Sequence, residues 1–179
     1  MGRTLGSIPA GSTKIQEAKH GIDTLWGYQY KGNDMKIEYR KGDLLTTDIQ
    51  HIVHGCNSLG VMGGGVAGAI RSKYPQAYND YINTYNHVGL GLGNIVISVQ
   101  DDGKTVYNAI TQKNYGRDHD TVYVSYWAIA EVFRHIDLFK IKEIAVPMIG
   151  AGLANGNWDV ISAIIENTLV NTKPVVYVL

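Results

Sequence analysis

The feature of this sequence that most constrains its fold is a regular exchange between short apolar runs and longer segments of helical periodicity, which begins at Met35. Four runs have the length and β-branched content of strands, namely KIEYRK (36–41), HIVHGC (51–56), EIAVPMI (143–149) and KPVVYVL (173–179). Three segments space their apolar or aromatic residues as helices do, namely 74–85, 122–139 and 158–170. Strands that alternate with helices predict an α/β fold whose sheet is covered on both faces.

A hairpin adds two further strands to this pattern. NIVISVQ (94–100) and TVYNAITQ (105–112) flank the tetrapeptide DDGK, whose Asp-Gly pair is typical of a tight turn between antiparallel strands. The central sheet is therefore expected to be mixed. Pro75 suits the first turn of the helix predicted over 74–85, because the nitrogen of a first-turn residue needs no partner within the helix.

The length of 179 residues and an apolar content of 45% favour a single well-filled domain. Residues 1–34 carry Gly, Ser and Pro without clean periodicity, so we expect an N-terminal extension there and one domain over 35–179. The extension either comes from outside the natural gene product or docks loosely on the domain. Trp26, Tyr28 and Tyr30 keep the docked alternative open.

Composition argues against several classes of function. Lys and Arg together number 16, as do Asp and Glu, so no strong field favours nucleic acid or an anionic membrane. No run reaches the roughly 18 apolar residues of a membrane span, and the N-terminus lacks the apolar core of a signal peptide, which predicts a cytoplasmic protein. A single cysteine excludes an internal disulfide, and the six histidines show no metal-ligand spacing, so we expect no metal and no cofactor.

Two glycine-loaded stretches follow predicted strands, GVMGGGVAG after 52–56 and GAGLANGNW after 143–149. Glycine lets backbone N–H groups approach a ligand closely, and two such loops at the carboxyl edge of a sheet suit a phosphate or pyrophosphate. Tight turns without a ligand are the alternative. Gly63, Gly65 and Gly68 match the dinucleotide pattern G-x-G-x-x-G, but six residues separate them from the strand, and no Walker lysine follows.

Four blocks in order resemble the signatures of macro domains, which are ADP-ribose-binding modules of three-layer α/β/α architecture with a mixed central sheet. These blocks are KGDLL (41–45), IVHGCNSLGVMGGGVAGAI (52–70), NAITQ (108–112) and VPMIGAGLANGNW (146–158). The sequence is most similar to the ADP-ribose-1″-phosphate phosphatases of yeast, bacteria and phages. The resemblance runs from Met35 to the C-terminus and leaves residues 1–34 uncovered.

The resemblance implies a binding role for several residues. Asp43 would accept a hydrogen bond from the adenine amino group, with Leu44 beside the ring, although a helix or turn cap is the alternative for an aspartate there. Asn57 would hold the hydroxyls of the distal ribose. The remaining contacts would come from the glycine loops: Gly63, Gly64 and Gly65 at the distal ribose and its phosphate, and Gly150, Ala151, Gly152 and Leu153 at the pyrophosphate.

For the chemistry, the resemblance points to His54 as a direct participant in phosphoryl transfer, because an imidazole can act as acid, base or acceptor near neutral pH. A hydrogen-bonded core histidine is the alternative. Related phosphatases carry an aspartate where this chain has Asn157, and an amide cannot take a proton at physiological pH. Asp159 could supply the carboxylate, or Asn157 and Asp159 could simply begin the last helix.

The predicted function is therefore binding of ADP-ribose and hydrolysis of ADP-ribose-1″-phosphate. The sequence leaves two alternatives open. One is a non-catalytic ADP-ribose or nucleotide-signal binding module, and the other is a hydrolase that removes ADP-ribose from modified proteins. None of these readings needs nucleic acid or a membrane as a partner.

Overall fold

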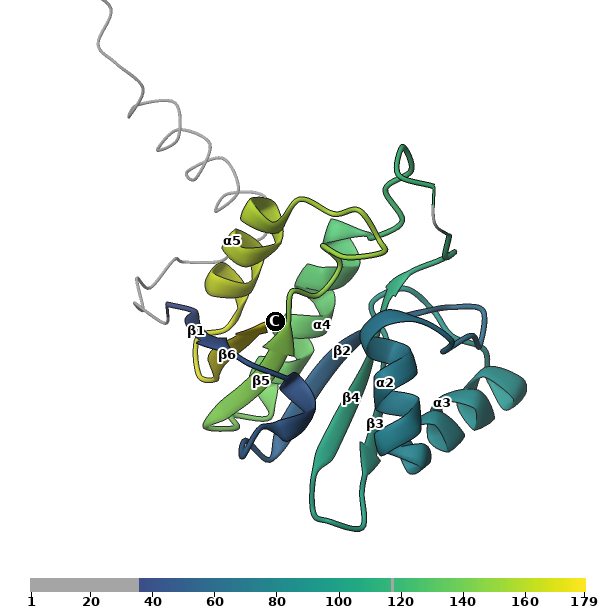
Figure 1. Ribbon diagram of the computed structural model, residues 1–179, viewed down its shortest axis with the longest axis horizontal. Coiled ribbons are helices and arrows are strands. Elements are labelled where there is room, and N and C mark those ends of the chain that lie inside the picture. The colour runs from purple at the N-terminus through teal and green to yellow at the C-terminus, as the bar shows by residue number, and fades with distance from the viewer. Residues whose placement is uncertain (1–35, 117) are drawn as a thin grey trace, which may run out of the picture. The chain divides into compact units, whose positions relative to one another are not determined.

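A computed structural model of the chain describes residues 36–116 and 118–179 (Figure 1). The extension predicted for 1–34 lies outside these residues. The described part contains a six-stranded mixed sheet with the strand order β1-β6-β5-β2-β4-β3, in which only the β3–β4 pair is antiparallel. The strands are β1 (Glu38–Lys41), β2 (His51–Asn57), β3 (Ile95–Val99), β4 (Thr105–Gln112), β5 (Glu143–Pro147) and β6 (Lys173–Val178).

Helices cover both faces of this sheet, as the alternation in the sequence predicts (Figure 1). One layer holds α2 (Gly65–Lys73) and α3 (Pro75–His87), and the other holds α4 (Tyr126–Leu138) and α5 (Trp158–Thr168). A short 3-10 helix, η1 (Leu44–Thr46), follows β1. Ile70 of α2 lies in a core cluster with Ile52 of β2, whereas Phe133 of α4 belongs to the core on the opposite face. The predicted α/β fold with three layers and a mixed sheet is confirmed.

One predicted boundary is wrong: α4 begins at Tyr126 rather than at residue 122. The backbone amides of Tyr123 and Val124 donate to the carbonyl of Ala154 at 2.9 and 3.3 Å, so these two residues form an extended connection. Ser125 then caps the helix by accepting a hydrogen bond from Ala128 N at 3.2 Å. Apolar periodicity alone could not locate this start, because the competing bond comes from a distant loop.

The parallel strands bring the loops of interest to one edge of the sheet. The chain leaves β1, β2 and β5 at their carboxyl ends and enters η1, the glycine stretch before α2, and the glycine stretch before α5, respectively. In open α/β sheets this edge is where ligands normally bind. No helix within residues 36–116 and 118–179 is long and apolar enough to cross a membrane.

Candidate ligand site at the carboxyl edge of the sheet

Asn57 ends β2 and shapes the loop that follows it. Its Oδ1 atom accepts hydrogen bonds from Leu59 N at 2.9 Å and Val61 N at 3.3 Å, and its Nδ2 atom donates to Val61 O at 2.6 Å. The side chain is almost fully buried, with 6% of its surface exposed. Asn57 therefore holds the first glycine loop in its conformation, which leaves one amide hydrogen for a ligand.

Two tyrosines of α3 contact this loop and hold it in place. The hydroxyl of Tyr81 donates to Asn57 O at 2.8 Å and lies 3.2 Å from Asn57 Oδ1. The ring of Tyr85 covers Gly60, whose φ of +74° suits glycine, and a Cβ built on Gly60 would lie 2.6 Å from that ring. In the sequence these tyrosines are indistinguishable from an ordinary apolar helix face.

The second glycine loop, after β5, is closed by its own backbone. Gly156 N donates to Gly150 O at 2.8 Å, and Asn155 N donates to Gly152 O at 2.9 Å. Gly150 has a φ of +76°, and a Cβ there would lie 2.7 Å from the side chain of Val124. The connection between β4 and α4 thus packs directly beneath this loop and fixes its position.

The two glycine loops meet at the edge of the sheet. Leu153 of the second loop is 55% exposed, and its Cδ1 atom would lie 3.4 Å from a Cβ built on Gly65 and 3.6 Å from one built on Gly64. A Cβ on Gly63 or Gly152 would have no neighbour within 4 Å. Gly63 and Gly152 therefore expose backbone groups without side chains, one in each loop beside Leu153.

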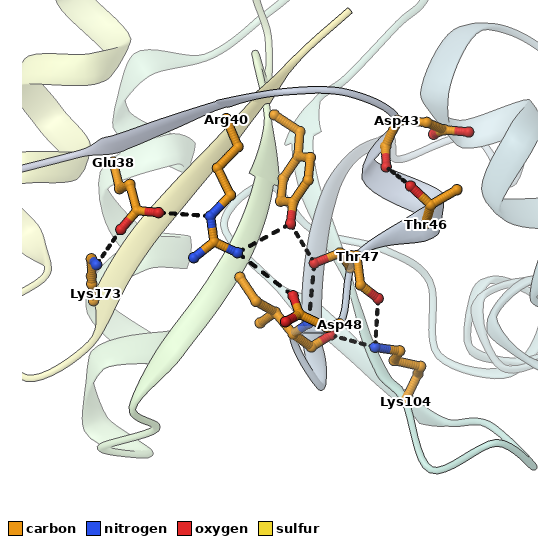
Figure 2. A network of polar contacts seen from close by, with 10 residues as sticks. Glu38, Arg40, Asp43, Thr46, Thr47, Asp48, Lys104 and Lys173 are labelled. Carbon is orange, nitrogen blue, oxygen red and sulfur yellow. Dashed lines mark hydrogen bonds and ion pairs between the residues drawn. The ribbon is translucent and has the colours of Figure 1, made fainter.

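Asp43 lies at the same edge, after β1, and caps η1. Its Oδ1 atom accepts a hydrogen bond from Leu45 N at 2.8 Å, and its carbonyl accepts one from Thr46 Oγ1 at 2.9 Å (Figure 2). The carboxylate is exposed, and its Oδ2 atom has no partner among the contacts of residues 36–116 and 118–179. Leu44 is buried in the core, so only its backbone is available to a ligand.

His54 is completely buried, with 0% exposure, on the face of β2 that α3 covers. Its Nε2 atom lies 2.7 Å from Oδ1 of Asn108, the residue beside it on β4. Asn108 Nδ2 donates to Ala77 O and Val96 O, so Asn108 Oδ1 must accept the proton that His54 Nε2 carries. Burial lowers the pKa of His54 to about 4. These contacts favour the hydrogen-bonded core histidine over a group that acts on a ligand.

Asn157 is the N-cap of α5. Its Oδ1 atom accepts hydrogen bonds from Asp159 N at 2.8 Å and Val160 N at 3.3 Å, while its backbone amide donates to the hydroxyl of Tyr126 at 2.9 Å. Asp159 is exposed in the first turn of the same helix, where a negative charge complements the helix dipole. Asn157 is the cap and Asp159 the first-turn acid of the alternative that the sequence left open, whereas the hydrogen bond with Tyr126 was not predicted.

The single cysteine, Cys56, lies on the same face of β2 as His54, with its Sγ atom 3.8 Å from the imidazole ring. Burial raises the pKa of this thiol, which keeps it protonated and unreactive at neutral pH. Within residues 36–116 and 118–179, no three side chains of His, Cys, Asp or Glu come together as a metal site.

Comparison with known proteins decides the family. The family model of the Macro domain matches residues 53–165, which is more than half of the chain. The chain belongs to the macro domain family. It is 30% identical over 126 residues to a DNA ADP-ribosyl glycohydrolase of Mycobacterium tuberculosis, with 69% of this chain but only 36% of that protein covered. It is also 30% identical over 137 residues to an ADP-ribose 1″-phosphate phosphatase of Candida albicans, with 69% of this chain and 87% of that protein covered.

Solved structures agree with this assignment. A Bacteroides thetaiotaomicron protein superposes with a TM-score of 0.73 and 28% identity, covering 82% of this chain and 100% of that one. The macrodomain of Mycobacterium tuberculosis DarG superposes with a TM-score of 0.67 and 26% identity, covering 79% of this chain and 96% of that one. This macro domain thus spans about a third of the glycohydrolase relative and most of the phosphatase.

The macro domain brings the predicted binding residues to one edge and keeps one predicted catalytic residue away from it. Asn57 ends β2, and Asp43 and the two glycine stretches lie in the loops that follow the carboxyl ends of β1, β2 and β5. His54 is instead enclosed between β2 and α3. The hydrogen bonds of Tyr81 and Tyr126 could not be predicted from the sequence, because they join these residues to loops far away in the chain.

Proposed function

We propose that this macro domain binds ADP-ribose at the carboxyl edge of its sheet and hydrolyses the phosphate monoester of ADP-ribose-1″-phosphate there. The observation that carries the proposal is the meeting of the two glycine loops, with Leu153 against Gly64 and Gly65. Two loops of bare backbone beside each other offer N–H groups to a pyrophosphate and to a second phosphate on the distal ribose.

The binding roles follow the positions of the side chains. Asp43 has an exposed carboxylate oxygen for the adenine amino group, and Asn57 has one remaining amide hydrogen for a hydroxyl of the distal ribose. Backbone groups of Gly63, of the neighbouring glycines and of the 150–153 segment would line the phosphates. A relative of similar length, the phosphatase of Candida albicans, supports the phosphate monoester as the substrate, because 87% of that protein is matched.

Hydrolysis of the monoester adds water to phosphorus and breaks the bond to the 1″ oxygen, giving ADP-ribose and inorganic phosphate. A base must take a proton from the water, and the departing ribose oxygen must gain one. Directed N–H groups can stabilise the charge that develops on the phosphate. Among residues 147–159 the single carboxylate belongs to Asp159, which is exposed, so Asp159 is the candidate base.

A second candidate rests on His54 and Asn157. His54 is buried and hydrogen-bonded within the core, and Asn157 uses its Oδ1 atom to cap α5. The enclosed imidazole and the use of Asn157 Oδ1 in the helix cap favour a domain that binds ADP-ribose derivatives without this reaction. Such a domain is either a non-catalytic binding module or a hydrolase that releases ADP-ribose from modified proteins.

Calorimetric titration with ADP-ribose, combined with a phosphate-release assay on ADP-ribose-1″-phosphate, separates these candidates. We expect ADP-ribose to bind and phosphate to be released, with release reduced by about 10²-fold or more in Asp159→Asn if Asp159 is the base. Release of ADP-ribose from a modified protein without phosphate release would favour the second candidate. Absence of ADP-ribose binding in the unsubstituted protein would refute both.

Asn157→Asp provides a matched comparison, because aspartate is also a good N-cap and leaves the start of α5 intact. If the amide at this position limits the reaction, the aspartate variant should release phosphate faster while its ADP-ribose affinity stays the same. Equal rates in the two proteins would mean that the group at residue 157 acts only on the helix.

A further inference from the structure

A polar network links the edge strand β1 and its neighbour β6 to the turn that carries Asp43 (Figure 2). Lys173 forms an ion pair with Glu38, and Glu38 in turn accepts a hydrogen bond from Arg40 Nε at 2.6 Å. The ion pair and hydrogen bond with Lys173, followed by those with Arg40, lower the pKa of Glu38. Arg40 Nη1 also donates to the hydroxyl oxygen of Tyr177 on β6 at 3.4 Å.

The hydroxyl of Tyr177 continues the network into the turn. It lies 2.8 Å from Oγ1 of Thr47, a residue that is 93% buried and follows η1 directly. Because a guanidinium can only donate, Tyr177 accepts from Arg40, whereas either hydroxyl can donate in the hydrogen bond between Tyr177 and Thr47. Thr47 Oγ1 also accepts a hydrogen bond from Ile49 N at 3.1 Å. The threonine hydroxyl is therefore shared between β6 and the backbone of its own loop.

The turn is attached to β6 at both of its ends. Gly42 N donates to Val178 O at 2.8 Å just before Asp43, and Thr47 contacts Tyr177 just after η1. The first attachment uses backbone only, so side-chain substitution cannot remove it. The second depends on two hydroxyl groups from residues 130 positions apart in the sequence.

Lys104 forms hydrogen bonds with the backbone that follows η1 in the same turn. Its Nζ atom donates to Thr47 O and to Ile49 O, each at 2.8 Å (Figure 2). The amide of Thr47 donates to Leu44 O at 3.2 Å, which closes the turn that begins at Asp43. A shift of Thr47 would therefore be passed through this closing bond to the residues that present the Asp43 carboxylate.

We propose that Tyr177 and Thr47 are positioning residues that set the orientation of Asp43 and thereby the preference of the site for adenine. This inference rests on the proposed function, because it takes ADP-ribose as the ligand. Neither residue touches the ligand in this account. Their effect passes through the turn, so their loss changes the choice of base more than the binding of the ribose and phosphates.

The test measures the affinity of the protein for ADP-ribose and for the analogue in which hypoxanthine replaces adenine. Hypoxanthine has a carbonyl oxygen where adenine has its amino group, so a well-oriented Asp43 carboxylate should discriminate against it. Asp43→Asn supplies the reference for lost discrimination. Tyr177→Phe removes one hydroxyl and keeps the ring, and Tyr107→Phe is its matched control because the Tyr107 hydroxyl contacts His51 at 3.2 Å, near the amino end of β2.

We expect Tyr177→Phe to lower the ratio of the two affinities about two- to tenfold, the range for one lost hydrogen bond. Thr47→Val should do the same, whereas Thr47→Ser, which keeps the hydroxyl, should preserve the ratio. A purely structural role would weaken both ligands equally and leave their ratio unchanged, and serine separates the effect of the hydroxyl from that of the methyl group.

An unchanged ratio in Tyr177→Phe and in Thr47→Val, with ADP-ribose still bound, overturns this inference alone. Failure of the unsubstituted protein to bind ADP-ribose overturns the proposed function and, with it, the base preference. A lowered ratio in Tyr107→Phe would also overturn the inference, because that hydroxyl has no contact with the turn.

Discussion

Replacing His54 by glutamine should remove a pH-dependent part of the stability while leaving ADP-ribose binding intact. Burial lowers the pKa of His54 from an ordinary value near 6.5 to about 4, against the smaller opposing effects of the hydrogen bonds with Asn108 and Gly55. The folded protein therefore favours the neutral imidazole. Glutamine can still donate a hydrogen bond to Asn108, but it does not titrate.

The sign and size of this pH effect on the free energy of unfolding follow from proton linkage. Between pH 6.5 and pH 4 the unfolded chain binds a proton at His54 and the folded chain does not, so the free energy of unfolding falls as the pH is lowered. The full stabilisation is present above pH 6.5. Lowering the pKa from 6.5 to about 4 corresponds to about 3 kcal/mol of stability lost on reaching pH 4.

Urea unfolding at several pH values between 7.5 and 4 measures this effect. Other groups titrate in the same range, so the informative quantity is the difference in slope between the unsubstituted protein and His54→Gln. We expect the variant to lose less stability on acidification. His87→Gln, at the exposed end of α3, is the matched control for exchanging a histidine for glutamine.

Equal slopes in the unsubstituted protein and His54→Gln would refute the reasoning, as would an NMR titration of the His54 ring with a midpoint near 6.5. The same variant bears on function. If phosphate is released by the unsubstituted protein, His54→Gln should release it at a similar rate. A rate loss of about 10²-fold or more at pH 7.5, with full stability there, would return His54 to a catalytic role.

Four further substitutions test the loops and the start of α5. Tyr81→Phe removes the hydroxyl bonded to Asn57, so calorimetry should show ADP-ribose binding weakened about two- to tenfold, with the melting temperature lowered by a few degrees through the lost buried hydrogen bond; equal affinity would contradict this support role. Gly150→Ala should lower the free energy of unfolding by about 1–3 kcal/mol, because its φ is +76° and a side chain would clash, whereas Gly152→Ala should cost little; denaturant unfolding that ranks them equally would refute this. Asn157→Ala should cost about 1 kcal/mol of stability through loss of the helix cap, measured in the same way, and a change below about 0.3 kcal/mol would contradict the capping role.

Local patterns in the sequence were sufficient for most of the fold. The alternation of strand and helix segments, the Asp-Gly turn between 94–100 and 105–112, and Pro75 at the first turn of α3 all predicted elements that the structure contains. Each of these signals depends on neighbouring residues, through backbone dihedral preferences and side-chain period. The same reasoning anticipated that Asn157 could cap a helix.

The surroundings of His54 depended on packing between distant segments. Strand alternation places His54 and Cys56 on one face of β2, but it does not say that α3 covers that face and that Asn108 supplies the hydrogen-bond partner. A histidine within a predicted strand was therefore compatible with both a ligand site and a core position. Burial, which only the assembled layers create, favours the core role and lowers the pKa of the imidazole.

The candidate site likewise combines features that the sequence determines with contacts that only the tertiary structure creates. The sequence by itself determined that two glycine-rich loops follow two parallel strands, and the topology of such sheets brings their ends to one edge. Only the tertiary structure decided that Leu153 contacts Gly65 and that Tyr177 reaches Thr47. Those contacts join residues 88 and 130 positions apart, and no local preference encodes them, because they arise when helices and strands pack into a common core.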